Sequence, residues 1–225
     1  MKTMPKPASK ESPAEKHGAP SPKRRPTPEE RRAAILSAAL DVFSQNGFAA
    51  AKLDDVAQKA GVAKGTLYLY FPDKEALFEA LVTGLASPVL DRVEALAADP
   101  SLSPVAVLDR ILEVFQQTIL EENRGRLLRL VISEGPRFPK IAAFHHREVV
   151  SRGLRIVRLL GARGYERGEL PSEAIARSPQ LFFAPFMLAV VWKSLFDRFD
   201  PLDVQTLIEV HRMSILGLTS KESRK

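Results

Sequence analysis

Apolar residues recur at helical spacing along most of the chain. Leu53, Val56, Ala57 and Ala60 form one such set, at positions i, i+3, i+4 and i+7. We find no stretch of strand length in which apolar and polar residues alternate, so we expect no sheet. The pattern therefore predicts an all-α protein.

Capping residues and prolines indicate where the predicted helices begin. Thr27 is placed to cap the first helix, with Pro28 at its first position and Glu30 completing a capping box. The predicted helices span residues 28–46, 53–60, 63–70, 73 onward, 104 onward, 126–132, 140–162, 179–199 and 201–218. The fourth of these contains Gly84 and Pro88, so we expect a kink there and not a clean end.

Two short predicted helices, 53–60 and 63–70, are joined by a tight turn at Gly61. Glycine adopts the positive φ that such a turn needs. Val56 and Leu67 are placed to form a core shared by the two helices. This arrangement is typical of a helix-turn-helix, which places its second helix in the DNA major groove.

The second of these helices has an outward face rich in hydrogen-bonding side chains, from Lys64, Thr66, Tyr68 and Tyr70. A helix of this kind fits the major groove, which is about 12 Å wide. The alternatives are a solvated lysine and tyrosines that pack in the core. Gly65 costs about 1 kcal/mol in a helix relative to alanine. It either marks a frayed helix start or allows close approach of the backbone to phosphate.

Positive charge is concentrated at the N-terminus. Residues 1–28 contain the basic residues Lys2, Lys6, Lys10, Lys16, Lys23, Arg24 and Arg25. Against Glu11 and Glu15 they give a net charge of +5, which leaves +1 for the rest of a chain whose formal charge is +6. Six prolines in residues 1–26 predict a disordered tail. It suits a polyanion such as DNA, and the alternative is a solubilising tail.

The composition excludes several classes of protein. The sequence has no cysteine, which removes disulfides and thiolate chemistry. The longest apolar run, residues 181–192, contains Pro185 and is too short for a bilayer that needs about 20 residues. There is no apolar N-terminal segment that could be a signal peptide. We therefore expect a soluble, cytoplasmic protein without a membrane partner.

No pattern in the sequence indicates catalysis or a bound cofactor. His145 and His146 lie near Glu148, but adjacent helical positions point about 100° apart and do not easily share a metal ion. We find no Ser-His-Asp order, phosphate-binding glycine loop or paired-carboxylate motif. We expect no catalytic residues, no metal, no cofactor and no enzyme activity.

The first ordered region has a more specific likeness. Residues 28–78 resemble the DNA-binding domain of the tetracycline-repressor (TetR) family of bacterial regulators. The residues that carry the resemblance are Phe43, Gly47, Phe48, Val56, Ala57, Ala60, Gly61, Val62, Gly65, Thr66, Leu67, Tyr68, Tyr70, Phe71, Lys74, Glu75, Ala76, Leu77 and Phe78. The rest of the chain resembles the family more loosely, in its helical pattern and in residues 134–139.

The resemblance implies roles for individual residues. Family members use the positions of the four outward-facing side chains named above to contact bases and phosphates. Tyr68 matches a tyrosine whose hydroxyl commonly meets phosphate, and Lys74 matches a phosphate-contacting lysine. Lys52 stands where many members have a capping threonine or serine, and lysine cannot cap in that way. Lys52 either contacts phosphate as a cation or is a solvated surface residue.

We expect four regions: a basic tail at 1–26, the helix-turn-helix domain at 27–75, a helical ligand-binding and dimerisation domain at 76–218, and a short tail at 219–225. The resemblance implies a homodimer formed through the last two helices. Candidate pocket residues for a small-molecule effector are Phe115, Phe144, Phe183 and Trp192, and plain core packing is the alternative for each.

The predicted function is that of a ligand-responsive regulator, most often a repressor in this family, which binds a palindromic operator. A small apolar ligand would release it by bending the fourth helix near Gly84 and Pro88. The alternatives are a DNA-binding regulator without an effector and a DNA binder indifferent to sequence.

Overall fold

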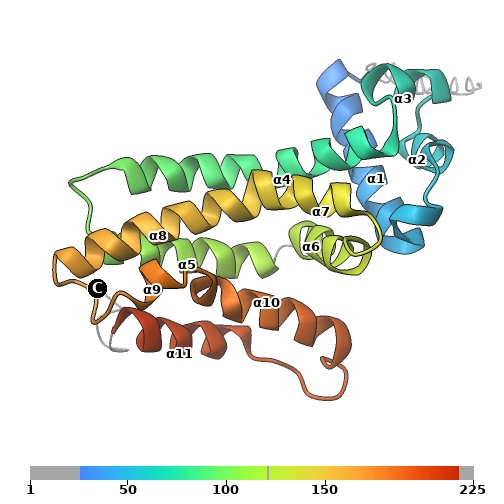
Figure 1. Ribbon diagram of the computed structural model, residues 1–225. Coiled ribbons are helices and arrows are strands. Elements are labelled where there is room, and N and C mark those ends of the chain that lie inside the picture. Colours follow the sequence, from blue (N-terminus) through green and yellow to red (C-terminus); the bar gives the residue numbers. More distant parts are fainter. Residues whose placement is uncertain (1–25, 121, 218–225) are drawn as a thin grey trace, which may run out of the picture.

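The computed structural model describes residues 26–120 and 122–217, and every regular element among them is helical (Figure 1). The elements are α1 (Pro28–Ala50), α2 (Leu53–Ala60), α3 (Lys64–Tyr70), α4 (Lys74–Ala98), α5 (Pro104–Leu120), α6 (Glu122–Glu134), α7 (Pro139–His145), the π-helical turn η1 (His146–Val150), α8 (Ser151–Glu166), α9 (Ala174–Arg177), α10 (Gln180–Leu195) and α11 (Val204–Leu216). The all-α prediction is confirmed. The predicted tails, 1–26 and 219–225, lie outside the described residues except for residue 26.

Local capping explains why the first helices begin and end where they do. The Thr27 side chain accepts from the Glu30 amide while the Glu30 carboxylate accepts from the Thr27 amide, as the capping box predicted. The predicted stop at Gly47 is correct in part. Gly47 has φ of +73° and breaks the helical geometry, but one further turn follows it. Gly61 ends α2 with φ of +67°.

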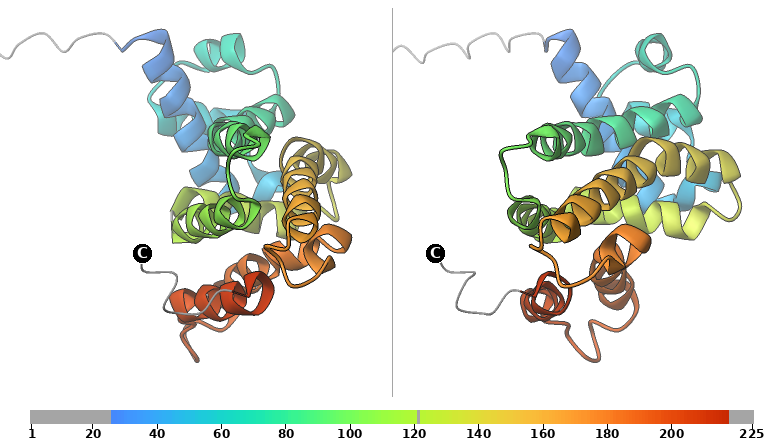
Figure 2. Two further views of the ribbon diagram at one scale, coloured as in Figure 1. Left: turned by 90° about the vertical axis from the view of Figure 1, so that its left-hand side faces the viewer. Right: turned by 60° about the vertical axis from the view of Figure 1, so that its left-hand side comes forward.

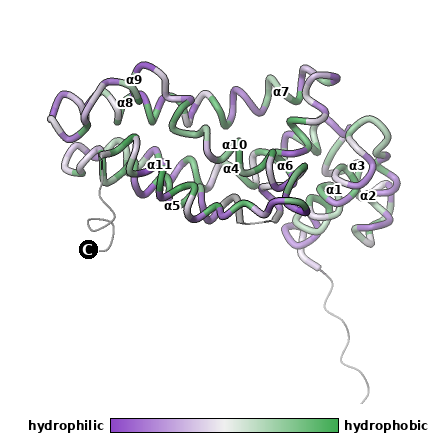
Figure 3. Tube along the Cα trace, turned by 90° about the horizontal axis from the view of Figure 1, so that it is seen from below, coloured by the Kyte–Doolittle hydropathy of each residue, from purple (hydrophilic) through white to green (hydrophobic). Residues whose placement is uncertain are grey.

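Helix α4 connects two hydrophobic cores. The first core joins the buried faces of α1 to α4 and also contains Leu127 and Leu130 of α6 and Ile141 of α7. The second contains Val93 and Ala97 of α4 together with α5 and α8 to α11. Apolar residues recur along α5 and α11, green in Figure 3, as this packing requires. Helices from the later part of the chain therefore help to build the core beneath the helix-turn-helix.

The segment of α4 that contains Gly84 and Pro88 lies between these cores. Gly84 and Pro88 interrupt neither the helix nor its course to Ala98. Burial is complete at Leu81 and Val82 on one side and returns at Leu90 on the other. The helix is thus held at both ends, with its proline in the span between.

The long seventh predicted helix has different bounds from those expected. Residues 139–166 form α7, η1 and α8 without a gap, so the helix runs past the predicted end at residue 162 and stops just before Gly168, which has φ of +70°. A Cβ on Gly161 would lie 2.8 Å from the Ala176 backbone nitrogen, and one on Gly164 would lie 2.8 Å from Leu170 Cδ1. These glycines allow α9 and the loop between α8 and α9 to pack closely against α8.

Other predicted boundaries also differ from those in the structure. The last helix begins at Val204 and not at Pro201, because the Asp203 side chain accepts from the Thr206 amide and caps it there. Helix α10 ends at Leu195, earlier than the predicted residue 199. Helix α6 starts at Glu122, earlier than predicted. The short helix α9 was not predicted.

In the part of the chain that the structure describes, no helix combines the length and apolar character needed to cross a bilayer.

Candidate nucleic-acid interface

Helices α2 and α3 form the predicted helix-turn-helix at the end of the molecule farthest from α11 (Figure 1). The turn is closed by the Gly61 amide, which donates to Gln58, and by the Val62 amide, which donates to the Ala57 carbonyl at 3.0 Å. Val56 and Leu67 are completely buried and join the first core. Their burial fixes which face of α3 points outward.

Lys64 begins α3 and is exposed, but it already has a partner. Its Nζ lies 2.8 Å from Oδ2 of Asp54 in α2 and 6.0 Å from the ring centre of Tyr68. The hydrogen bond that Lys64 donates to the Asp54 carboxylate raises the pKa of Lys64. Exposed ion pairs of this kind are weak and exchange readily with other anions. The ammonium can therefore reach DNA once it leaves Asp54.

Gly65, Thr66 and Tyr68 lie on the accessible side of α3. Space around Gly65 is open, since a Cβ there would meet nothing within 4 Å. Tyr68 is 43% exposed, whereas Thr66 is half-buried. A surface of this kind can bring backbone and hydroxyl groups into the major groove.

Tyr70 holds α3 against the start of α1. Its hydroxyl donates to the Pro28 carbonyl at 3.3 Å, and its half-buried ring packs against the first core beside Phe71. The chain therefore enters the fold next to the C-terminal end of α3.

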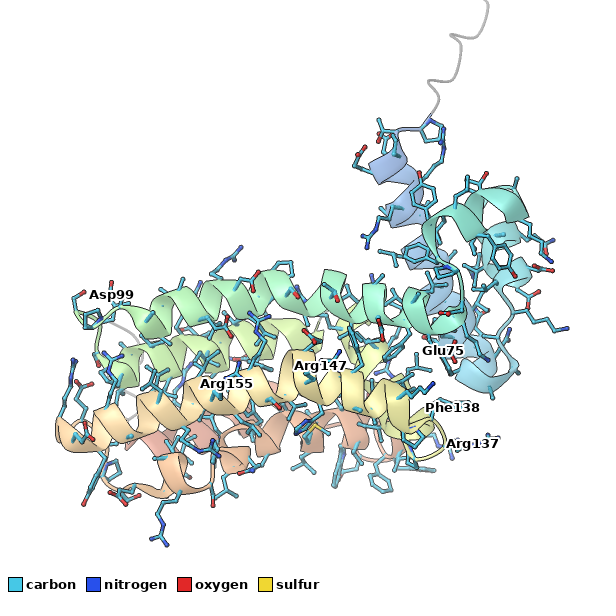
Figure 4. The ribbon with its side chains drawn as sticks, turned by 45° about the horizontal axis from the view of Figure 1, so that its top comes forward. Glu75, Asp99, Arg137, Phe138, Arg147 and Arg155 are labelled. Atoms are coloured by element: carbon cyan, nitrogen blue, oxygen red, sulfur yellow. The ribbon has the colours of Figure 1, made fainter. Side chains whose placement is uncertain are left out.

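Lys74 is directed into the fold. Its Nζ donates to the carbonyls of Phe48 and Ala49, at 2.9 and 3.0 Å, and lies 4.8 Å from the ring centre of Phe48. The ring of Phe138, labelled in Figure 4, is 5.9 Å away. The ammonium thus caps the carbonyls that the kink at Gly47 leaves open at the end of α1. In this conformation the Lys74 ammonium is hydrogen-bonded within the protein, and its contact with phosphate stays a prediction.

Lys52 is exposed at the start of α2, and no side-chain hydrogen bond caps that helix. This is the consequence expected of lysine at a capping position. Its ammonium has no ion pair among the described residues.

A polar junction that the sequence did not reveal joins the helix-turn-helix to α6. Nη2 of Arg126 lies 2.7 Å from Oδ1 of Asp41 and donates to the Leu40 carbonyl at 3.4 Å. Lys59 of α2 lies 3.2 Å from the other carboxylate oxygen. The Arg126 hydrogen bond lowers the pKa of Asp41 despite its partial burial. Only the charge of Asp41 on an otherwise buried helix face could have indicated this contact.

The four predicted pocket residues do not surround one cavity. Phe115 and Phe183 pack together, with ring centres 5.1 Å apart, in the second core. Phe144 packs against the first core, and the guanidinium of Arg147, labelled in Figure 4, covers its ring. Trp192 donates to the Asp200 carbonyl near the end of α10.

A cavity lies elsewhere among the described residues, between α1, α6 and α10. Its volume is about 650 Å³. The lining is mostly apolar and consists of Phe43, Ser44, Gly47, Arg126, Arg129, Leu130, Ile132, Ser133, Val190, Val191, Ser194 and Leu195. The cavity therefore contacts α1, which with α2 and α3 forms the recognition end of the molecule, and also the helices α6 and α10 behind it.

Comparison with known proteins gives relatives for both parts of the chain. Residues 35–81 match the model of bacterial regulatory proteins of the tetR family, and residues 106–213 match the C-terminal domain of AefR-like transcriptional repressors. The HTH-type transcriptional regulator RutR of Escherichia coli K12 is 42% identical over 78 residues, which is 35% of this chain and 36% of RutR. The match thus spans about a third of that relative.

Other relatives match more of the chain. The uncharacterized HTH-type regulator YdgC of Bacillus subtilis is 30% identical over 151 residues, covering 65% of this chain and 74% of YdgC. FadR of Bacillus subtilis, solved in complex with stearoyl-CoA, has the same fold with a TM-score of 0.64, 22% identity and coverage of 83% and 99% of the two chains. The chain belongs to the tetR family of bacterial regulatory proteins.

Proposed function

We propose that this protein is a cytoplasmic, sequence-specific transcriptional repressor that binds a palindromic operator as a homodimer. The observation that carries the proposal is the orientation of α3. Leu67 is buried beneath it, while Gly65 and Tyr68 remain accessible at the end of the molecule. A helix held in this way can enter the major groove without rearrangement of the core.

The dimer is proposed from the opposite side of the molecule, where α10 and α11 form an outer layer (Figure 2). Leu181, Leu188 and Leu195 are exposed at intervals of seven residues along α10. Val210 and Met213 are exposed on α11. An apolar surface of this kind suits a second copy of the chain, and a two-fold dimer matches an inverted repeat.

A small, largely apolar effector is proposed for the cavity between α1, α6 and α10. Its volume of about 650 Å³ is that of an ordinary ligand site. An occupant would contact Phe43 of α1 and Val190 of α10 at the same time. It could therefore change the position of the recognition end relative to the dimer helices. This location replaces the predicted aromatic set, which does not enclose a common space.

The central experiment is selection of DNA from a random pool by the full chain. We expect an inverted repeat, with each half-site read by one α3. Tyr68→Ala should weaken binding to the selected site by about 1–3 kcal/mol at fixed salt. Binding that is indifferent to sequence, or unchanged in this variant, would contradict the proposal.

The effector requires a separate measurement. Small apolar compounds that raise the melting temperature would be titrated with and without operator DNA. An effector that releases the protein must bind the DNA-free form more tightly, and operator must weaken its binding by the same factor. Ser133→Trp should fill the cavity and abolish ligand binding. Equal dissociation constants in the two titrations would remove the effector from the proposal.

A further inference from the structure

Leu69 in α3 is the most exposed large hydrophobic residue of the described chain, at 87%. It was not among the residues that the sequence singled out, because a leucine in a short amphipathic helix is normally part of the core. Its neighbour Leu67 is such a residue and is completely buried. The two leucines of α3 therefore have opposite environments.

The helical geometry places Leu69 at the centre of the outward face. Successive residues of a helix are rotated by about 100°, so Gly65 and Leu69 both lie about 160° from Leu67. The hydrogen-bonding residues Lys64 and Tyr68 occupy one flank of this face. Tyr70, on the other flank, is tied to the start of α1. The part of α3 that points most directly away from the core is thus one glycine followed, a turn later, by one leucine.

Gly65 increases the reach of this leucine. The space around Gly65 is open, and it has no side chain to hold α3 away from a partner. A helix that approaches a groove along this line brings its backbone close at Gly65 and inserts the next outward side chain, which is Leu69. Leucine has no donor or acceptor, so it gains nothing from phosphate or from the polar edges of bases.

We propose that Leu69 contacts the C5 methyl group of a thymine in the major groove and contributes to the choice of operator sequence. The thymine methyl is the apolar group that base pairs display in this groove. The inference rests on the proposed function, since it requires α3 to enter the groove. Its competitor is an ordinary exposed leucine without a role, which is common on protein surfaces.

The test uses the full chain and the DNA site that it selects from a random pool. Each thymine of that site is replaced singly by uracil, which removes the methyl group and keeps every hydrogen-bonding group of the base. Dissociation constants are measured at fixed salt for the wild type and for Leu69→Ala. We expect one thymine in each half-site at which uracil weakens wild-type binding about fourfold. Leu69→Ala should bind the thymine and uracil sites equally.

Leu159→Ala is a matched control, since Leu159 of α8 is also exposed, at 50%, and lies outside the helix-turn-helix. This variant should keep the wild-type response to uracil. The inference is overturned if no thymine shows a methyl effect in the wild type, or if Leu69→Ala shows the same effect as the wild type. Failure of the full chain to select any sequence would instead overturn the proposed function, and this inference with it.

Discussion

The recognition end and the α10–α11 face both expose apolar side chains, but in different patterns. On α3, Leu69 stands alone at the centre of a narrow face with polar flanks. On α10, exposed leucines recur every seven residues from Leu181 to Leu195, beside exposed residues of α11. An isolated apolar group suits a small apolar target in a polar groove, whereas a continuous stripe suits a protein surface of the same kind.

The helix-turn-helix region and the segment that precedes it differ in net charge. Residues 28–75 contain six lysines or arginines and seven aspartates or glutamates, so the helix-turn-helix region is not basic. The positive charge lies in the segment before it, which has a net charge of +5 over residues 1–28. Because the folded helix-turn-helix region carries no net positive charge, we expect most of the electrostatic attraction to DNA to come from the segment before it.

The largest effect is expected from placing a charge among the exposed leucines of α10. Leu188 is 45% exposed in the single chain, and in a two-fold dimer formed through α10 Leu188→Glu would place one carboxylate from each subunit in the interface. A buried charge without a partner costs about 3–5 kcal/mol, roughly a thousandfold in the dimer dissociation constant. We expect sedimentation to show a folded monomer that has lost its affinity for operator.

Leu159→Glu provides the control for this variant, because Leu159 is equally exposed but lies on α8. It should remain dimeric and bind DNA normally. If Leu188→Glu also remains a dimer with full affinity, the exposed leucines of α10 are not the dimer interface. Their regular spacing then does not distinguish their role from that of a single exposed leucine such as Leu69.

The second prediction concerns what the recognition end does not expose. Lys74→Met keeps the apolar stem but removes the ammonium that binds the Phe48 and Ala49 carbonyls. We expect the unfolding free energy to fall by about 2–3 kcal/mol, because two carbonyls lose a charged donor. The salt dependence of DNA binding should not change. A decrease of the salt slope by about one, with stability unchanged, would instead support the phosphate contact implied by the family resemblance.

The contacts of Lys74 show which features of the site could not be predicted from the sequence. The helix-turn-helix follows from local signals, such as the Thr27 cap and the Gly61 turn, and the structure has both. The partners of Lys74 are carbonyls in the last turn of α1, beyond the break at Gly47, and local patterns do not show which side chain will reach them. Leu69 and Leu67 are the same residue type two positions apart, so their opposite environments depend on how α3 packs.

The fold behind the site was predicted less well for a related reason. The seventh predicted helix was expected to end at residue 162, because glycine weakens a helix and a glycine-rich stretch, 161–168, begins there. The helix does end within this stretch, just before Gly168 with its φ of +70°, but not at the glycines Gly161 and Gly164. In the structure they lie within α8 and provide room for Ala176 and Leu170. Contacts of this kind join residues that the local pattern treats separately. For the same reason the four aromatic residues predicted for one pocket do not share a cavity. Their spacing along the helices does not show which of them face each other.

The third prediction tests whether the basic residues of the N-terminal segment 1–25, and not the helix-turn-helix region, supply the charge that attracts DNA. Deletion of residues 1–25 removes most of the basic excess and leaves Thr27 and its capping box in place. Affinity for the selected site should fall about tenfold at low salt, and the salt slope should decrease by about 0.9 for each phosphate contact that is lost. The preferred sequence should not change, because α3 is intact. An unchanged slope would assign the tail to solubility alone.

The smallest expected effect concerns the ion pair between Lys64 and Asp54, whose atoms lie 2.8 Å apart. DNA must compete with the Asp54 carboxylate for this ammonium, so Asp54→Asn should raise operator affinity by about two- to fivefold at low salt. The gain should diminish as salt increases, because the pair is exposed and therefore screened. Asp55→Asn removes the same charge from the adjacent residue, which has no such bond to Lys64, and measures the general electrostatic contribution. Only the excess of the first variant over the second reports release of Lys64. If the two variants gain equally in a titration across salt concentrations, Lys64 is not restrained by Asp54, and the head recognises DNA without breaking any contact of its own.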